Sequence, residues 1–158
     1  MNILAFGDFS LNGICCDPNY YSNIRKTFTQ FNKCLPDADI KIVNWEAPVT
    51  FNGIIAEEAK NPLCTTKLTA ELSNSFNFTI ANIGNNHIGD FGLEGYNETC
   101  AFLNKNNIKY LGAGIDDSAF NQLILDYKDY KIGLLSYVGK ETNPNKLKYS
   151  GIKIISID

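Results

Sequence analysis

The chain has 158 residues, of which 44% are hydrophobic and 12% aromatic, enough apolar material for one domain with a buried core. Its net charge is -3, and its 14 lysine and arginine residues are scattered along the sequence, so we expect no basic surface for nucleic acid. This composition disfavours both intrinsic disorder and nucleic-acid binding.

No apolar run reaches the roughly 18 residues that a membrane-spanning helix needs, and Met1 leads directly into the apolar segment Ile3–Phe6. We therefore expect no membrane span and, for the chain as given, a cytoplasmic location. A protein trimmed after a signal peptide or an anchor would look the same, so an extracytoplasmic location stays open.

The five cysteines are widely spaced, and no Cys-x-x-Cys pair indicates a zinc or redox centre. We therefore expect reduced thiols with structural roles. Cys34 and Cys100 fall on the apolar faces of predicted helices, where they should be buried like other small hydrophobic side chains.

The first part of the chain predicts a strand, a helix and a second strand. Ile3–Phe6 is a short apolar run, Tyr20–Leu35 has apolar residues at helical spacing, and Asp39–Val43 is a second apolar run. A carboxylate follows each strand, because Asp8 comes after the first and Glu46 after the second.

The middle part predicts an irregular excursion and then two units of helix and strand. Thr66 is the expected N-cap of the first of these helices. The predicted segments are the excursion Phe51–Pro62, the helix Lys67–Phe76, the strand Phe78–Ala81, the helix Leu93–Asn107 and the strand Ile108–Leu111. Strands and helices that alternate in this way favour parallel pairing of the strands.

The last part predicts antiparallel and irregular structure. The predicted segments are a turn at Gly112-Ala113-Gly114, a short helix from Asp117, a hairpin of Gln122–Tyr127 and Lys131–Tyr137, a polar loop at Lys140–Tyr149 and a strand at Ile152–Ile157. Together the elements predict an α/β fold, a mostly parallel sheet flanked by helices, in a single domain that spans residues 1–158.

The only histidine of the chain, His87, lies in an oxygen-rich run from Asn82 to Asp90, directly after a predicted strand. Amide oxygens, an imidazole and a carboxylate within a few residues suit a hard or borderline divalent metal. A structural interpretation stays open, since Asn, Gly and Asp are also common turn residues.

Three predicted strand ends carry such groups: Asp8 after the first strand, Glu46 after the second and Asn85-Asn86-His87 after the third. In an open α/β sheet these ends converge on one edge. Two carboxylates and an amide oxygen brought together there would need a cation. If the three ends do not converge, each is only a turn residue.

Five segments of the chain resemble, in order and approximate spacing, the bacterial capsule-synthesis CapA family. The segments are Gly7-Asp8-Phe9-Ser10-Leu11, Asn44–Thr50, Asn85–Gly92, Tyr110–Gly114 and Gly133–Tyr137. That family is associated with poly-γ-glutamate and surface polysaccharide production, and it looks like a branch of the calcineurin-like metallophosphoesterase superfamily. The resemblance implies half of a two-sheet metallophosphatase-like sandwich, in which this chain would be the N-terminal part of a longer CapA-like domain.

The resemblance also implies a role for each site residue. Asp8 would be a ligand of a first metal, Glu46 a bridging carboxylate and Asn86 a ligand of a second metal, the ions being Mn, Zn or Fe. His87 would be a general acid or charge stabiliser, oriented by Asp90. Such a site supports attack by a metal-activated hydroxide on a phosphoryl or acyl centre.

The chain also departs from the family pattern. Ser10 stands where the superfamily has a histidine two residues after the first aspartate, and the further histidines that the longer family domain supplies are absent. A metal-dependent hydrolase would therefore need residues from outside this chain to complete its site.

Two functions remain in view for a CapA-like protein of capsule, exopolysaccharide or poly-γ-glutamate biosynthesis. In the first, the metal site acts on an anionic polymer or on a phosphorylated or carbohydrate substrate. In the second, the same fold binds a polyanion or a carbohydrate without turning it over, or assembles with a partner such as membrane-bound capsule machinery.

Overall fold

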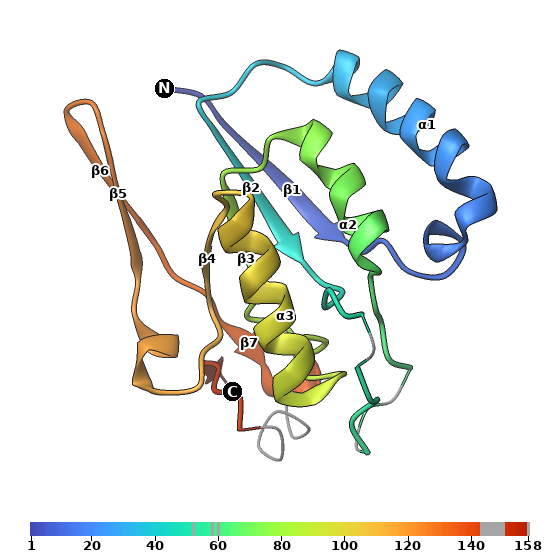
Figure 1. The fold of residues 1–158 in the computed structure, drawn as a ribbon. Coiled ribbons are helices and arrows are strands. Elements are labelled where there is room, and N and C mark those ends of the chain that lie inside the picture. The colour runs from blue at the N-terminus through green and yellow to red at the C-terminus, as the bar shows by residue number, and fades with distance from the viewer. Residues whose placement is uncertain (52, 58, 60, 143–150, 158) are drawn as a thin grey trace.

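A computed structural model describes residues 1–51, 53–57, 59, 61–142 and 151–157. Its centre is a parallel sheet whose strand order follows the chain: β1 (Ile3–Phe9), β2 (Ile40–Trp45), β3 (Ile80–Asn82) and β4 (Lys109–Leu111). The connections between successive strands carry the helices α1 (Tyr21–Cys34), α2 (Lys67–Leu72) and α3 (Gly92–Lys105) (Figure 1). The predicted α/β fold with a parallel sheet flanked by helices is confirmed, and it is consistent with a metallophosphatase-like fold.

All three helices pack on the same face of the sheet. Phe28 of α1, Ala70 of α2 and Leu103 of α3 join one hydrophobic cluster, which also contains Val43 and Trp45 of β2. Since successive side chains of a strand point to opposite faces, Val43 and Trp45 lie on one side of β2, and Ile40, Ile42 and Asn44 lie on the other.

The opposite face of the sheet is covered in part by a hairpin. Strands β5 (Leu123–Tyr127) and β6 (Tyr130–Leu134) pair antiparallel, as the sequence predicts. Their inward side chains pack against a second cluster, formed by Ile40, Ile80 and Leu111 of the sheet. The helices and the hairpin therefore bury the sheet from its two sides.

Short elements complete the described part of the chain. Strands β7 (Val138–Gly139) and β8 (Ser156–Ile157) form a small parallel pair. The short 3-10 helices are η1 (Gly13–Cys16), η2 (Pro18–Tyr20), η3 (Ser73–Phe76), η4 (Asp117–Phe120) and η5 (Lys140–Thr142).

The predicted helix Lys67–Phe76 is correct at its start and divided at its end. Thr66 caps α2 as expected, since its hydroxyl accepts a hydrogen bond from the Thr69 amide at 3.3 Å. After Leu72 the chain tightens into η3, and Asn77 then adopts a left-handed conformation with φ of 52°. Asparagine tolerates this conformation better than most residues, and the left-handed turn at Asn77 ends η3 at Phe76.

Two predicted strands near the end of the chain are too long. The run Lys131–Tyr137 is a strand only as far as Leu134, and Ile152–Ile157 is a strand only at Ser156–Ile157. Lys153 instead forms an isolated antiparallel bridge with Gly114. Of the predicted loop Lys140–Tyr149, residues 140–142 form η5 and residues 143–149 lie outside the described part.

The prediction that Cys34 is buried is wrong, whereas Cys100 is buried as expected. Cys34 is at the last position of α1, a helix in which no residue is fully buried and Phe31 is 50% exposed. Among the described residues, the apolar face of α1 contributes only the partly buried Phe28 to the core, whereas α3 contributes four buried side chains, Tyr96, Cys100, Phe102 and Leu103.

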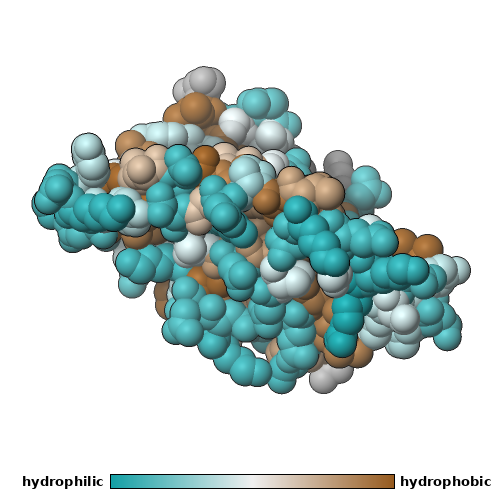
Figure 2. Space-filling view, turned by 90° about the horizontal axis from the view of Figure 1, so that it is seen from above, coloured by the Kyte–Doolittle hydropathy of each residue, from teal (hydrophilic) through white to brown (hydrophobic). Residues whose placement is uncertain are grey.

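The described residues contain no helix with both the length and the hydrophobicity needed to cross a bilayer. Seen from above Figure 1, hydrophobic groups reach the surface as separate patches among hydrophilic side chains (Figure 2). Scattered exposure of this kind is ordinary for a folded domain.

Candidate functional site

Polar side chains stand next to one another where the first three strands end. Asp8 of β1 is opposite Asn44 of β2, and Asn44 is opposite Asn82 of β3. Asn44 Nδ2 donates a hydrogen bond to Asp8 Oδ1 at 2.6 Å, and Asn82 Nδ2 donates to Asn44 Oδ1 at 3.0 Å. The strand pairing therefore holds three polar side chains in one row across the sheet.

A break in the register of β1 brings Asp8 into this row. The pairing of β1 with β2 shifts between Ala5 and Asp8, so that Asp8 rather than Gly7 is opposite Asn44. Irregularities of this kind re-aim side chains and are common beside functional sites. The exposed Asp8 carboxylate is thereby turned toward the asparagine on the neighbouring strand.

The row continues beyond the strands to Ser136, in the connection between β6 and β7. Ser136 Oγ donates a hydrogen bond to Asn82 Oδ1 at 2.6 Å, and the Gly84 amide donates to the same oxygen at 3.2 Å. Asp8, Asn44, Asn82 and Ser136 together are called the polar ladder below. It links four segments that lie far apart in the sequence.

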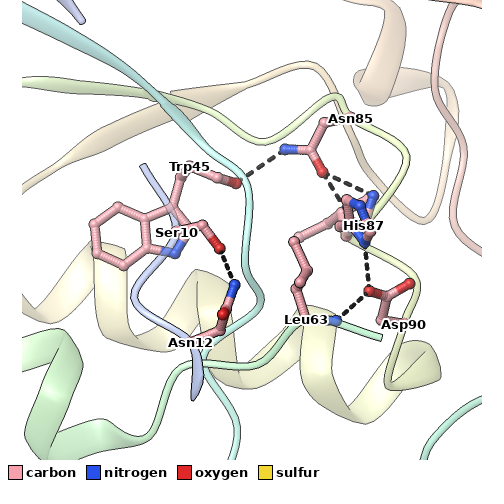
Figure 3. Close-up of polar contacts among 8 residues, drawn as sticks. Ser10, Asn12, Trp45, Leu63, Asn85, His87 and Asp90 are labelled. Carbon is pink, nitrogen blue, oxygen red and sulfur yellow. Dashed lines mark hydrogen bonds and ion pairs between the residues drawn. The ribbon is translucent and has the colours of Figure 1, made fainter. Parts of the chain in front are cut away.

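Asn85 shapes the loop that follows β3. Its Nδ2 donates to the backbone oxygen of Trp45 at 2.9 Å, and its Oδ1 accepts from the amides of His87 at 3.0 Å and Ile88 at 3.1 Å (Figure 3). A side chain that bonds to the backbone two residues ahead is typical of a turn-forming asparagine. Asn85 therefore ties the loop to the end of β2.

His87 is held by Asp90. His87 Nδ1 lies 2.7 Å from Asp90 Oδ2, the same oxygen that accepts from the Leu63 amide at 2.7 Å (Figure 3). Asp90 is fully buried, whereas the His87 side chain retains 15% exposure. A carboxylate beside Nδ1 favours the tautomer with its proton there, which makes Nε2 the acceptor nitrogen of the neutral ring.

Glu46 follows β2 and stands in the electrostatic field of the same groups. Burial raises the pKa of its carboxyl, the neighbouring charge of Asp8 raises it further, and His87 opposes these effects. The Glu46 amide donates to the Phe9 backbone oxygen at 3.1 Å, which keeps the start of this loop beside β1. The Asp8 charge thus disfavours the ionised form of the Glu46 carboxyl.

Of the five predicted site residues, His87 and Asp90 are in direct contact, and the Glu46 carboxyl is influenced by the charges of Asp8, His87 and Asp90. Asn86 is half-buried in the same loop, between Asn85 and His87. The roles of Asp8, Glu46 and Asn86 as metal ligands stay predictions. Within the described ranges, no three His, Cys, Asp or Glu side chains gather as a metal cluster.

Ser10, two residues after Asp8, is engaged in its own loop. Its hydroxyl accepts a hydrogen bond from Asn12 Nδ2 at 2.7 Å (Figure 3). This pair lies in the short segment between the end of β1 and the start of η1. The Ser10 hydroxyl therefore stabilises the loop that follows β1.

Sequence reasoning assigned no site role to Asn44 or Ser136, and it placed Asn82 only at the start of the oxygen-rich run. A signal was present in the two asparagines, since Asn44 continues the face of Ile40 and Ile42, and Asn82 continues the face of Ile80. Parallel strands buried on both faces are normally apolar throughout, so a polar residue in such a row is unusual. Ser136 carries no comparable signal, because its partner is known only from the tertiary structure.

Comparisons with known proteins agree on a capsule-related family. The profile of the family described as "Bacterial capsule synthesis protein PGA_cap" matches residues 2–153. The "PGA biosynthesis protein CapA" of Bacillus subtilis (strain 168) is 35% identical over 72 residues, which are 45% of this chain. The matched stretch is 19% of the length of that relative.

Proposed function

This chain belongs to the bacterial capsule synthesis protein family PGA_cap, and from this premise we propose that it carries a metallophosphatase-type cation site for the synthesis of a poly-γ-glutamate or polysaccharide capsule. Asp8, Glu46 and the Asn86 amide would hold the cation. The substrate would be the anionic polymer itself or a phosphorylated or carbohydrate precursor.

The observation that carries the proposal is the strand pairing at the sheet edge, which sets Asp8 opposite Asn44 and Phe9 opposite Trp45, the residue before Glu46. Asp8 helps to raise the pKa of Glu46, which means that the two charges repel each other in the folded protein. A divalent cation would offset this repulsion, and carboxylate and amide oxygens are suitable ligands for it. The donor chemistry therefore fits a cation, with water or residues from outside this chain as further ligands.

The neighbouring pair of His87 and Asp90 suits proton transfer. Asp90 fixes the ring through Nδ1, so that Nε2 can accept or return a proton at a bound group. When bound, a divalent cation would supply positive charge to stabilise negative charge that develops on a phosphoryl or acyl group. The proposed site would thus combine charge stabilisation by the cation with proton transfer by the His87 imidazole, which Asp90 holds in place.

A second candidate function is binding of a polyanion or a carbohydrate without turnover, or assembly with membrane-bound capsule machinery. The histidine content favours it, since the chain has a single histidine and the described residues form no larger cluster of charged ligands. A site of this kind would use the same cation to hold an anionic group. We therefore expect weak or no phosphodiesterase activity from this chain by itself.

Thermal unfolding with and without Mn²⁺ tests the cation site. A ligand that binds the folded state alone stabilises it by about 2.7 kcal/mol at 100 times its Kd, so Mn²⁺ should raise the melting temperature of the wild type. Asp8→Ala should remove most of this increase. Asp126→Ala, which removes an exposed carboxylate on the hairpin, is the matched control and should keep it.

An equal response of Asp8→Ala and the wild type would refute this site. Turnover of bis-p-nitrophenyl phosphate in the presence of Mn²⁺ then separates the two candidate functions. Robust turnover by the wild type, lost in His87→Ala, would establish the hydrolase. Mn²⁺ binding without turnover would favour the binding function.

A further inference from the structure

The polar ladder has a single direction. Ser136 donates to Asn82, Asn82 donates to Asn44, and Asn44 donates to the Asp8 carboxylate. Each asparagine uses its Nδ2 toward Asp8 and its Oδ1 toward Ser136. Because the carboxylate can only accept, it determines the orientation of Asn44, which in turn determines that of Asn82.

Hydrogen bonds arranged in one direction polarise one another, and a bond to an ionised acceptor is stronger than one between neutral groups. The 2.6 Å bond at Asp8 is such a bond. The ladder therefore restrains Asp8 through Oδ1, and the second oxygen of the carboxylate is left for another partner.

The surrounding backbone makes room for the ladder at Ser136. A Cβ on Gly84 would lie 2.5 Å from the Gly112 backbone oxygen and would collide with Ser136 Oγ. A Cβ on Gly112, whose φ is +99°, would collide with Ser136 Oγ and lie 2.7 Å from Asn82 Oδ1. Two glycines from different segments thus leave space for one hydroxyl.

All five segments that carry the family resemblance meet at this ladder. The first and second supply Asp8 and Asn44, the third supplies Asn85, whose Nδ2 donates to Asn44 Oδ1 at 3.4 Å, the fourth supplies Gly112, and the fifth supplies Ser136.

We propose that Asn44, Asn82 and Ser136 are positioning residues that hold the Asp8 carboxylate through Oδ1 and leave Oδ2 for a divalent cation. This inference rests on the cation site proposed above. It assigns a function to Ser136, which lies two asparagines away from Asp8 along the ladder.

The inference is tested by measuring the Kd for Mn²⁺ from the free-ion signal in electron paramagnetic resonance. Loss of a group that orients a metal ligand weakens affinity by about 10-fold or more, and we expect this for Ser136→Ala. Ser73→Ala is the matched control, because Ser73 is also buried and its hydroxyl donates at 2.6 Å to the Ala70 backbone oxygen, outside the ladder. Its Kd should equal that of the wild type.

Asn82→Leu breaks the middle of the ladder and should weaken Mn²⁺ binding at least as much as Ser136→Ala. Unfolding followed by circular dichroism without metal reports purely structural effects of each variant. A lower melting temperature of Ser136→Ala with an unchanged Kd would overturn the positioning role while the cation site stands. Absence of Mn²⁺ binding to the wild type would overturn both the site and the inference.

Discussion

The two faces of the central sheet differ in what they bury. On the helix side, Trp45 and the rings of Phe9, Phe76 and Phe78 form an aromatic cluster, with the Phe9 and Phe78 centroids 5.1 Å apart. On the hairpin side, β2 and β3 begin with isoleucines and carry the asparagines of the polar ladder near their carboxyl ends. The helix side is lined by apolar side chains along the strands, whereas the hairpin side changes from apolar to polar side chains at the carboxyl ends of β2 and β3.

Within the same strands, the helix face therefore contributes mainly to stability, and the hairpin face carries the candidate site. Burying an amide costs free energy unless its hydrogen bonds are satisfied, and an apolar residue at the same place would avoid that requirement. The helix face of β2 and β3 carries apolar side chains, and its one departure from this requirement among the described residues is the buried Trp45 Nε1, which has no hydrogen-bond partner. The hairpin face departs from the apolar pattern only where the strand ends carry the candidate site, which is where such departures are expected.

The largest expected effect is on the helix face. Phe76 is 3% exposed and contacts the rings of Phe28 and Phe78 at 5.0 and 5.3 Å between centroids. Phe76→Ala should lower the free energy of unfolding by about 3–5 kcal/mol, because it removes buried area and leaves a cavity. Urea unfolding measures the change. Phe120→Ala, at a 43% exposed position, is the control, and a loss of equal size there would contradict the comparison.

A smaller effect is expected where the backbone makes room for the polar ladder. Gly84→Ala should lower the free energy of unfolding by about 1–3 kcal/mol, because the added methyl group meets the Gly112 backbone and Ser136. Gly133→Ala is the matched control, since a Cβ there meets nothing within 4 Å. If both variants are equally stable in urea, the close approach of Gly84 to Gly112 and Ser136 does not contribute to the stability of the folded protein.

The smallest effect is a change in the pH dependence of stability at Glu46. Because burial and Asp8 raise its pKa, the folded state holds the Glu46 proton to higher pH than the unfolded state does. Stability is therefore lost as pH rises from the ordinary glutamate pKa through the raised one. Glu46→Gln should remove this loss and become more stable relative to the wild type at neutral pH than at acidic pH.

Melting temperatures of both proteins across the pH range measure this difference. Glu71→Gln, on the exposed side of α2, controls for the removal of one carboxylate. Melting temperatures of Glu46→Gln and the wild type that change in parallel at all pH values would show that the surroundings do not disfavour the ionised form of the Glu46 carboxyl.

The fold was predictable because its signals are local. Apolar runs marked β1 and β2, helical spacing marked α1 and α3, and the turn near Lys128 marked the hairpin. The errors fell where tertiary contacts decide the outcome. Lys153 pairs with Gly114 instead of continuing a strand, and Ser136 leaves its strand to reach Asn82.

The sequence by itself determined the order of the elements, the parallel sheet and the appearance of Asp8, Glu46 and His87 at strand ends. These features depend on residue spacing, which the chain carries in its own order. Only the tertiary structure decided which distant groups meet: the register shift that sets Asp8 opposite Asn44, the bond from the Leu63 amide to Asp90, and the ladder that ends at Ser136. Contacts between distant segments depend on strand register and on the space left by glycines, and neither can be read from the spacing of residues along one strand.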